Sequence, residues 1–326
     1  MLPEDDPMLR SFLIYLSKAA WAQRIVTHWK FAYRAASRFI AGTSLDDAIN
    51  VVKELNSKGM NVTLDQLGEH TTTSEEASNA TDGIIAILEE IDKEKIRSNV
   101  SIKLTQIGLA IDIQHCRQNL EKILAKAKEL HNFIRIDMED TPYTDKTIEL
   151  FRAMRVNGYR NTGIVVQSCL YRTETDVRNL LEEENSFRLV KGAYKEPASL
   201  AYPKKSDVDA NFDKLTGIMI NSAVLSGKRE VSEDGLFPPV TALGTHDEKR
   251  ISFGIKFAKE KGLPQKGIEF QMLYGIRRDI QERLVDEGYP VRIYVPFGTH
   301  WYPYFVRRLA ERPANLWFFI SNFFKK

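Results

Sequence analysis

Charged and polar side chains stand at or just after the carboxyl ends of eight short β-rich segments. They are Glu69, Lys103, Asp137, Gln167, Arg188, Lys191, His246, Tyr274 and Tyr294. Each by itself is more simply explained as a solvated loop residue or as half of an ion pair at a rim. Because the ends of parallel strands meet at one mouth of a barrel, their shared position favours a binding site there. Lysines and arginines in one mouth suit an anionic small molecule.

Two adjacent arginines, Arg307 and Arg308, lie in an aromatic segment that is predicted to be helical. Neighbouring helical positions diverge by about 100°, and Glu311 follows within reach of either arginine. An exposed charged stripe is the simpler interpretation. Nearby aromatic residues indicate a buried face instead: Trp301, Tyr302, Tyr304 and Phe305. Two forked guanidiniums beside such a face would bind a carboxylate.

The turn Lys191-Gly192-Ala193 follows a predicted strand. Glycine is routine in such a turn, but it would also let the backbone approach a ligand closely. Lys191 and Arg188 would then supply positive charge to a phosphate or to a reduced ring. No second histidine stands at ligand spacing from His246, so a hydrogen-bonding role is favoured over metal binding. The sequence predicts no metal site.

β-Rich and helical patterns alternate after Gly59. The expected strands are 61–67, 99–104, 133–138, 163–168, 187–190, 240–243, 268–273 and 291–295. The expected helices between and after them are 75–91, 116–130, 145–156, 175–183, 209–225, 248–261, 278–287 and 302–319. Eight such units predict an α/β fold with a parallel (βα)8 barrel of TIM type. A doubly wound open sheet is the alternative, but it typically has a glycine-rich turn where this chain has only Gly68.

Residues before Gly59 give helical signals only, and Ser44 is a predicted helix cap. We therefore expect an N-terminal helical arm over 1–59 and a somewhat distorted barrel over 60–326 that carries the sites. The polar stretch 228–235 is interpreted as a surface excursion before the sixth strand.

The composition excludes several classes of protein. The chain has 326 residues, 28% of them charged, and a formal net charge of +2, which gives no reason to expect a nucleic-acid partner. The start is acidic and no apolar run is long enough to span a bilayer. The two cysteines, Cys116 and Cys169, lack metal-type spacing and fit a reducing compartment. We expect a cytoplasmic protein.

Six segments resemble the proline dehydrogenase family, in order along the chain. They are 101–104 (SIKL), 136–139 (IDME), 188–194 (RLVKGAY), 269–275 (EFQMLYG), 292–298 (RIYVPFG) and 307–315 (RRLAERPAN). The last resembles the final-helix signature of that family. Each match is modestly specific, and six in register are highly specific. The length is similar to that of the monofunctional bacterial members, which are related to the dehydrogenase domain of the bifunctional proline utilization flavoenzymes.

The resemblance implies an oxidoreductase, a FAD-dependent L-proline dehydrogenase acting in the first step of proline catabolism. Proline would be oxidised to Δ1-pyrroline-5-carboxylate by hydride transfer to N5 of a non-covalently bound flavin, and the electrons would pass to a quinone. Handover of the product to pyrroline-5-carboxylate dehydrogenase is a further expectation. The aromatic C-terminus, 316–326, is expected to pack on the protein, with peripheral contact at the inner face of a membrane as the alternative.

The resemblance also implies roles for individual residues. The proline carboxylate would be bound by Lys103, Arg307 and Arg308, and the ring would be enclosed by Tyr294, Tyr304 and Leu273, with Tyr194 nearby. Glu69 would pair with one of the two arginines as a gate. Asp137 and Arg188 would be catalytic, with Arg188 near flavin N5. FAD would be held by Met138, Gln167, Arg188, Lys191, Gly192, Ala193, Thr245 and His246. Asp247 stands where bifunctional relatives typically carry asparagine, so it is left out of the cofactor set.

Two other functions stay open on the residues alone. A Schiff-base lyase would use Lys103 or Lys191 as its nucleophile, activated by Arg188. A catalytically silent barrel would serve as a binding protein. A visible spectrum separates the three, since only a flavoprotein is yellow.

Overall fold

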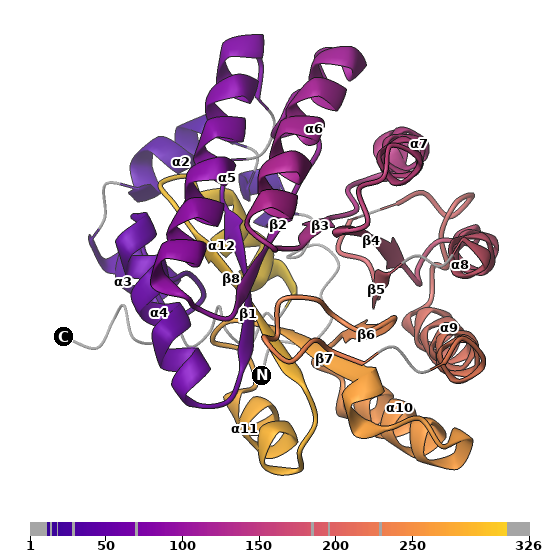
Figure 1. Cartoon of the computed structure of the whole chain (residues 1–326). Helices are drawn as coiled ribbons and strands as arrows, with labels where there is room; N and C mark the ends of the chain where they lie inside the picture. Colours follow the sequence, from indigo (N-terminus) through magenta and orange to yellow (C-terminus); the bar gives the residue numbers. More distant parts are fainter. Residues whose placement is uncertain are drawn as a thin grey trace.

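The chain folds into a closed barrel of eight parallel strands that follow one another in chain order (Figure 1). The computed structural model describes residues 12–13, 15–17, 19–27, 30–68, 71–183, 186–194, 196–227 and 230–311. The strands are β1 (Asn61–Gln66), β2 (Ser98–Ile102), β3 (Ile134–Ile136), β4 (Thr162–Gln167), β5 (Phe187–Val190), β6 (Thr241–Gly244), β7 (Ile268–Leu273) and β8 (Val291–Phe297). The predicted (βα)8 barrel is confirmed.

The described helices precede β1, alternate with the strands around the outside of the barrel, or follow β8 (Figure 1). They are α2 (Ala20–Thr27), α3 (Lys30–Ala36), α4 (Leu45–Ser57), α5 (Ser74–Glu94), α6 (Ile113–Glu129), α7 (Thr141–Val156), α8 (Thr173–Glu182), α9 (Lys205–Leu225), α10 (Glu248–Lys261), α11 (Arg278–Asp286) and α12 (Trp301–Glu311), with a 3-10 turn at Gln265–Gly267. Ser44 caps α4 as predicted, in a capping box with Asp47. The part of the predicted last helix beyond residue 311 lies outside the described residues.

The strands separate an apolar outer face from a polar barrel interior. Successive strand residues point to opposite faces. In β3, Ile134 and Ile136 are fully buried in the main hydrophobic core, where the helices cover the sheet. The alternate positions, Arg135 and Asp137, meet polar residues from other strands. The interior of such barrels is more often filled by branched apolar residues. In this barrel, charged and polar side chains occupy part of that space instead.

Two helices occupy unusual positions for a barrel. Helix α4, which precedes the first strand, packs on β1 and β8 with its buried face of Ala48, Ile49, Val52 and Leu55. Helix α12, which follows the last strand, packs against α2 and α3 in a second apolar cluster. The helix after β8 is thereby directed toward the mouth of the barrel, while α4 covers the outer face. The boundary expected at residue 59, between the N-terminal helical arm and the barrel, stays a prediction.

The segment before β6 closes the other end of the barrel. Glu233 and Asp234 are exposed, as a surface excursion requires, but Gly235 is buried. The Gly235 carbonyl accepts from Arg292 at 2.6 Å, and the Leu236 carbonyl accepts from Asn99 at 2.9 Å. The interpretation of 228–235 as a surface feature is therefore wrong at its end, because interior side chains bind its backbone. Within the described ranges, no helix has the length and apolar character needed to cross a membrane.

Candidate active site

A cavity of about 500 Å³ opens at the carboxyl ends of β5 to β8. Its lining includes seven of the predicted site residues from strand ends: Arg188, Lys191, Gly192, Ala193, Thr245, His246 and Leu273. Tyr294 and Arg308 complete the predicted residues that line it. Strand ends and the loops after them carry the active sites of TIM-type barrels. The structure thus brings predicted substrate and cofactor residues into one space.

Asp137 is the centre of a buried charge cluster below this cavity. One carboxylate oxygen is bound by Arg188, and the other accepts from the Tyr294 hydroxyl at 2.8 Å, with Lys103 Nζ 3.6 Å away. Lys103 Nζ also lies 3.1 and 3.2 Å from the two oxygens of Asp65. Two carboxylates face two cations, so the cost of burying each charge is offset by a partner.

The Tyr294 ring is held between the two cations. Its centroid lies 5.4 Å from the guanidinium carbon of Arg188 and 5.9 Å from Lys103 Nζ. Burial, together with the charges of Asp137 and Asp65, raises the pKa of Tyr294 well above its usual range. The phenol therefore stays protonated at ordinary pH and remains a hydrogen-bond donor to Asp137.

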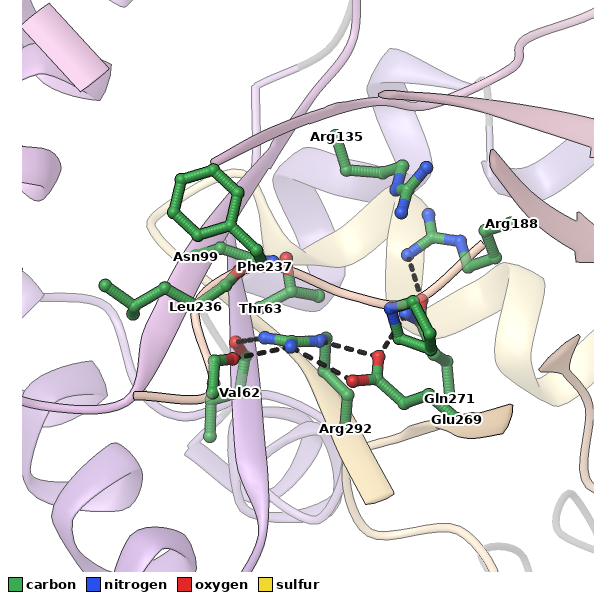
Figure 2. A network of polar contacts seen from close by, with 12 residues as sticks. Val62, Thr63, Asn99, Arg135, Arg188, Leu236, Phe237, Glu269, Gln271 and Arg292 are labelled. Atoms are coloured by element: carbon green, nitrogen blue, oxygen red, sulfur yellow. Dashed lines mark hydrogen bonds and ion pairs between the residues drawn. The ribbon is translucent and has the colours of Figure 1, made fainter. Parts of the chain in front are cut away.

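A chain of polar contacts supports Arg188 from below (Figure 2). Arg188 donates to Gln271 Oε1 at 3.1 Å, and Gln271 Nε2 donates to Glu269 at 2.5 Å. Glu269 in turn binds Arg292 through two contacts of 2.8 and 3.1 Å. Because the Gln271 amide is fixed at both ends, its oxygen must face Arg188. The arginine is held in one orientation.

Lys191 forms the charged rim of the cavity. Its Nζ binds Asp209 and lies 2.6 Å from Asp247. Burial acts to raise the pKa of Asp247, but the hydrogen bond and charge of Lys191 outweigh it and the pKa falls below the usual range. Asp247 is also the N-cap of α10, accepting from the Lys249 N–H at 3.0 Å. This pairing gives the unexpected aspartate a structural role at the rim.

The Lys191-Gly192-Ala193 turn exposes backbone to the cavity. Gly192 has φ 111°, and a Cβ there would collide with Sγ of Cys169, so the turn requires glycine. His246 Nε2 accepts from the Leu273 N–H at 2.8 Å, which places the ring proton on Nδ1 and ties the end of β6 to the end of β7. The structure describes no group of three or more potential metal ligands.

Helix α12 brings its arginine pair to the mouth. Arg308 lines the cavity, and its guanidinium carbon lies 5.0 Å from the centroid of the buried Tyr304 ring. Arg307 is half-buried and is not among the lining residues. The helix thus presents the two adjacent arginines differently, as their divergence around a helix requires.

Several predicted residues lie outside the cavity lining. Lys103 and Asp137 belong to the buried cluster below it, Met138 is buried, and Gln167 Nε2 donates to the Glu139 carbonyl at 3.1 Å. Tyr194 is half-buried beside the turn. Glu69, the predicted gate, lies outside the described residues.

Sequence reasoning missed five charged or polar residues of this region: Asp65, Asp209, Glu269, Gln271 and Arg292. Asp65, Glu269, Gln271 and Arg292 share a signal that the sequence does contain. Each is polar or charged at an alternate position of an otherwise apolar strand. A period-2 reading of polar positions would have placed them in the barrel interior.

Residues 48–320 match the family described as proline dehydrogenase. Proline dehydrogenase 2 of Bacillus subtilis is 39% identical over 317 residues, covering 97% of this chain and 99% of that protein. Proline dehydrogenase of Deinococcus radiodurans is 39% identical over 297 residues, covering 90% and 91%. The structure of proline utilization A from Bdellovibrio bacteriovorus has a TM-score of 0.77 at 24% identity, covering 93% of this chain and 36% of that one. That likeness supports the fold.

Proposed function

This chain belongs to the proline dehydrogenase family, and we propose that it works with FAD bound non-covalently in the cavity at the mouth of its barrel. The chain is an oxidoreductase that oxidises proline to Δ1-pyrroline-5-carboxylate. The family is flavin-dependent. One observation carries the assignment of the site: the cavity joins the Lys191-Gly192-Ala193 backbone, Arg188 and Arg308 in one space.

The lining of the cavity suits a flavin nucleotide. Gly192 opens the backbone to close approach. Lys191 and Lys205 bring ammonium groups to the rim, where they pair with Asp209 and Asp247 and could also donate to phosphates. Thr245 and His246 lie just before the N-terminus of α10, the end of a helix that favours anions. Met138 and Gln167 would support the cradle from the ends of β3 and β4. Bound FAD would supply the hydride acceptor, and the protein would position the cofactor and the substrate and provide the electrostatic environment.

Residues on the substrate side suit an amino acid with a ring. Arg308, with Arg307 beside it and Lys103 below, would bind the carboxylate. Tyr294, Tyr304 and Leu273 would enclose the pyrrolidine ring, with Tyr194 and Glu69 at the edge of the pocket. Arg188, fixed by Asp137 and Gln271, would direct positive charge at the redox centre. Proline must lose its amine proton before C5 gives up hydride, because the nitrogen lone pair forms the new C=N bond.

The electron acceptor and location follow from the same proposal. We infer that a quinone reoxidises the enzyme and that the protein is cytoplasmic, with peripheral contact at the inner membrane face. Large apolar side chains exposed on the N-terminal helices support that contact: Phe12, Tyr15, Trp21 and Ile25. The product would pass to pyrroline-5-carboxylate dehydrogenase. The C-terminal segment 316–326 lies outside the described residues.

The Schiff-base alternative is disfavoured by the surroundings of both lysines. Lys103 lies against Asp65 and Asp137, and Lys191 against Asp209 and Asp247. A nucleophilic lysine is usually activated by an apolar or cation-rich environment. Each of these lysines instead has two carboxylate partners.

A spectrum of the purified protein tests the proposal. We expect a flavin absorbance that proline bleaches without oxygen, one cyclic imine formed per flavin, and release of FAD into the supernatant after acid precipitation. Colourless protein, or flavin retained in the acid pellet, would contradict non-covalent FAD. A protein that binds FAD but forms no imine from proline would contradict the catalytic assignment.

A matched pair of glycine variants tests the location of the cofactor. Gly192→Ala places a methyl group against Cys169 in the proposed cradle and should lower the FAD to protein ratio severalfold. Gly262→Ala also introduces a side chain at a positive φ, 70°, but it meets nothing within 4 Å, at the end of α10. It should retain FAD. Equal FAD content in both variants would remove the turn from the cofactor site.

A further inference from the structure

Arg135 is a buried cation that the proposed function does not use. It lies in β3 two residues before Asp137, with only 2% of its side chain exposed. Its guanidinium donates to the carbonyls of Ile164 at 3.1 Å and Ser186 at 3.0 Å, and to Oγ of Ser186 at 3.3 Å. All of these acceptors are uncharged. The Phe133 ring also lies against it, with its centroid 4.9 Å from the guanidinium carbon.

The other charges of the interior cluster have partners of opposite sign. Lys103 binds Asp65, Arg188 binds Asp137, and Arg292 binds Glu269. We define the interior cluster as these six residues and Arg135. Four cations then face three carboxylates, and the excess positive charge belongs to Arg135. A guanidinium is so basic that it stays protonated at ordinary pH even where its surroundings lower its pKa.

The fold makes room for this cation. Arg135 pairs in register with Gly163 of β4, and a Cβ at Gly163 would overlap the guanidinium and lie 2.5 Å from the Ser186 carbonyl. Only glycine leaves the space into which Arg135 extends. Burying an arginine without a carboxylate is costly, and an apolar residue would pack here at less expense. We therefore expect the charge of Arg135 to have a function other than packing.

Arg135 lies close enough to Arg188 to act on the same region. Figure 2 shows the two guanidiniums next to each other above the Glu269–Arg292 pair. Burial lowers the pKa of Arg135, and repulsion by Arg188 lowers it further. The more distant charges of Glu269 and Asp137, which make no hydrogen bond to Arg135, act on this pKa in the opposite direction. Arg188 lines the cavity and Arg135 does not. A positive charge is thus placed beneath the floor of the cavity, shielded from solvent.

We propose that Arg135 is an electrostatic positioning residue whose unpaired charge raises the reduction potential of the flavin bound in the cavity. The inference rests on the proposed function, since it requires a flavin there. Hydride transfer from proline C5 adds one negative charge to the cofactor, and a buried cation nearby stabilises that charge. A unit charge about 10 Å away at an effective dielectric constant near 20 changes the equilibrium about tenfold. For a two-electron couple, tenfold corresponds to about 30 mV.

Ser186 allows the charge to be cancelled without removing Arg135. Its Oγ contacts the guanidinium, and it also lines a cavity of about 400 Å³ at the other end of the barrel, which gives a larger side chain room. Ser186→Asp supplies the missing carboxylate, while Ser186→Asn is its uncharged match. We expect the aspartate variant to favour oxidised flavin about tenfold, lowering the midpoint potential by about 30 mV. The asparagine variant should keep the wild-type potential.

A second pair of variants changes the arginine itself. Arg135→Met should lower the potential as Ser186→Asp does, and Arg135→Lys should keep it, because lysine retains the charge. Midpoint potentials are measured by equilibration with a reference dye on the flavin-loaded proteins, with folding checked by circular dichroism. If Arg135→Met does not fold, the Ser186 pair decides. The KM for proline should stay within about twofold, since neither residue lines the cavity at the carboxyl ends of the strands.

The outcomes separate the inference from the function on which it rests. If Ser186→Asp and Ser186→Asn have the same midpoint potential, the electrostatic role of Arg135 is overturned. This holds whether or not that potential differs from the wild-type value. A lysine variant that shifts as far as the methionine variant would show that contacts, not charge, matter. Wild-type protein that binds no flavin would instead overturn the proposed function.

Discussion

The Tyr294 hydroxyl donates a 2.8 Å hydrogen bond to Asp137, joining β8 to the residue that follows β3 across the barrel. Asp137 accepts on its other oxygen from Arg188, so both carboxylate oxygens have donors. The side chain proposed to enclose the substrate ring is thereby coupled to the pair proposed to act on the redox centre. Two roles assigned separately from the sequence belong to one hydrogen-bonded unit.

Tyr294→Phe should lower kcat/KM for proline without loss of FAD. The change removes a hydrogen bond to a charged group, worth about 1.5–3 kcal/mol, which corresponds to roughly a ten- to hundred-and-fiftyfold loss. Because the pKa of Tyr294 lies well above its usual range, the phenol does not ionise as pH rises to 10. The alkaline side of the kcat/KM profile should therefore have the same shape in both proteins. An alkaline limb lost in the variant would mean that Tyr294 titrates in the working range.

Arg188→Met should leave FAD bound, slow reduction of the flavin by proline and lower the flavin potential. Asp137 keeps Tyr294 at 2.8 Å and Lys103 at 3.6 Å as partners, so its charge is not left bare. Arg188→Lys should restore part of the rate, since it keeps the charge but loses the fork that reaches Gln271. Stopped-flow reduction under anaerobic conditions measures the rate. An unchanged rate in the methionine variant would remove Arg188 from the catalytic residues.

Gly163→Ala and Gly217→Ala should affect stability in opposite directions. The first adds a methyl group where Arg135 and Ser186 leave no room, and overpacking of this kind costs about 1–3 kcal/mol or more. The second adds a methyl group inside α9, with Phe257 at an ordinary 3.6 Å. Alanine favours a helix over glycine by up to about 1 kcal/mol. Thermal unfolding of both variants tests this, and a Gly163→Ala protein as stable as wild type would contradict the packing around Arg135.

Cys169 should react slowly with iodoacetamide at pH 8 and faster as the pH rises. Burial raises the pKa of its thiol to about 11, with Glu196 adding to the effect. The thiolate, which is the reactive form, is then about 0.1% of the total at pH 8, against roughly a quarter for an ordinary thiol. We expect alkylation at least about tenfold slower than that of free cysteine, measured by peptide mass spectrometry. A rate that levels off below pH 9 would disagree with this environment.

The barrel could be predicted because each strand carries its own apolar outer face and each helix its own pattern. The bounds of β5, β7 and α10 agree with the prediction residue for residue. The pattern could not predict which side chains of different strands form ion pairs in the barrel interior. Glu269 meets Arg292 because β7 and β8 lie side by side, and Lys103 meets Asp65 because β2 adjoins β1. Such partners depend on closure of the sheet, which no local sequence window contains.

Positions of whole helices were also beyond the sequence. The periodicity of α12 shows a buried face but not which surface covers it, so the neighbours α2 and α3 and the approach of Arg308 to the cavity appear only in the structure. Asp247 was recognised as a departure from bifunctional relatives. Its contacts with Lys191 and with the start of α10 depend on the fold, which brings the ends of β5 and β6 together.

The arginine pair of α12 gives the sharpest test of the substrate site. Arg308 lines the cavity beside Tyr304, so Arg308→Met should remove a charge-assisted hydrogen bond to the proline carboxylate, about 1.5–3 kcal/mol. That is roughly a ten- to hundred-and-fiftyfold loss in kcat/KM. Arg307→Met should also lower kcat/KM, but by less, because Arg307 is not among the cavity-lining residues.

Controls separate the clamp from a general effect of charge. Arg308→Lys should recover only part of the loss, since lysine lacks the planar fork. Arg178→Met, on the exposed side of α8, removes the same charge far from the substrate and should leave kcat/KM unchanged. FAD content should stay at the wild-type ratio in every variant, because neither α12 arginine is assigned to the cofactor. Wild-type kcat/KM in both Arg307→Met and Arg308→Met would show that the pair only decorates a helix and that the carboxylate is bound elsewhere.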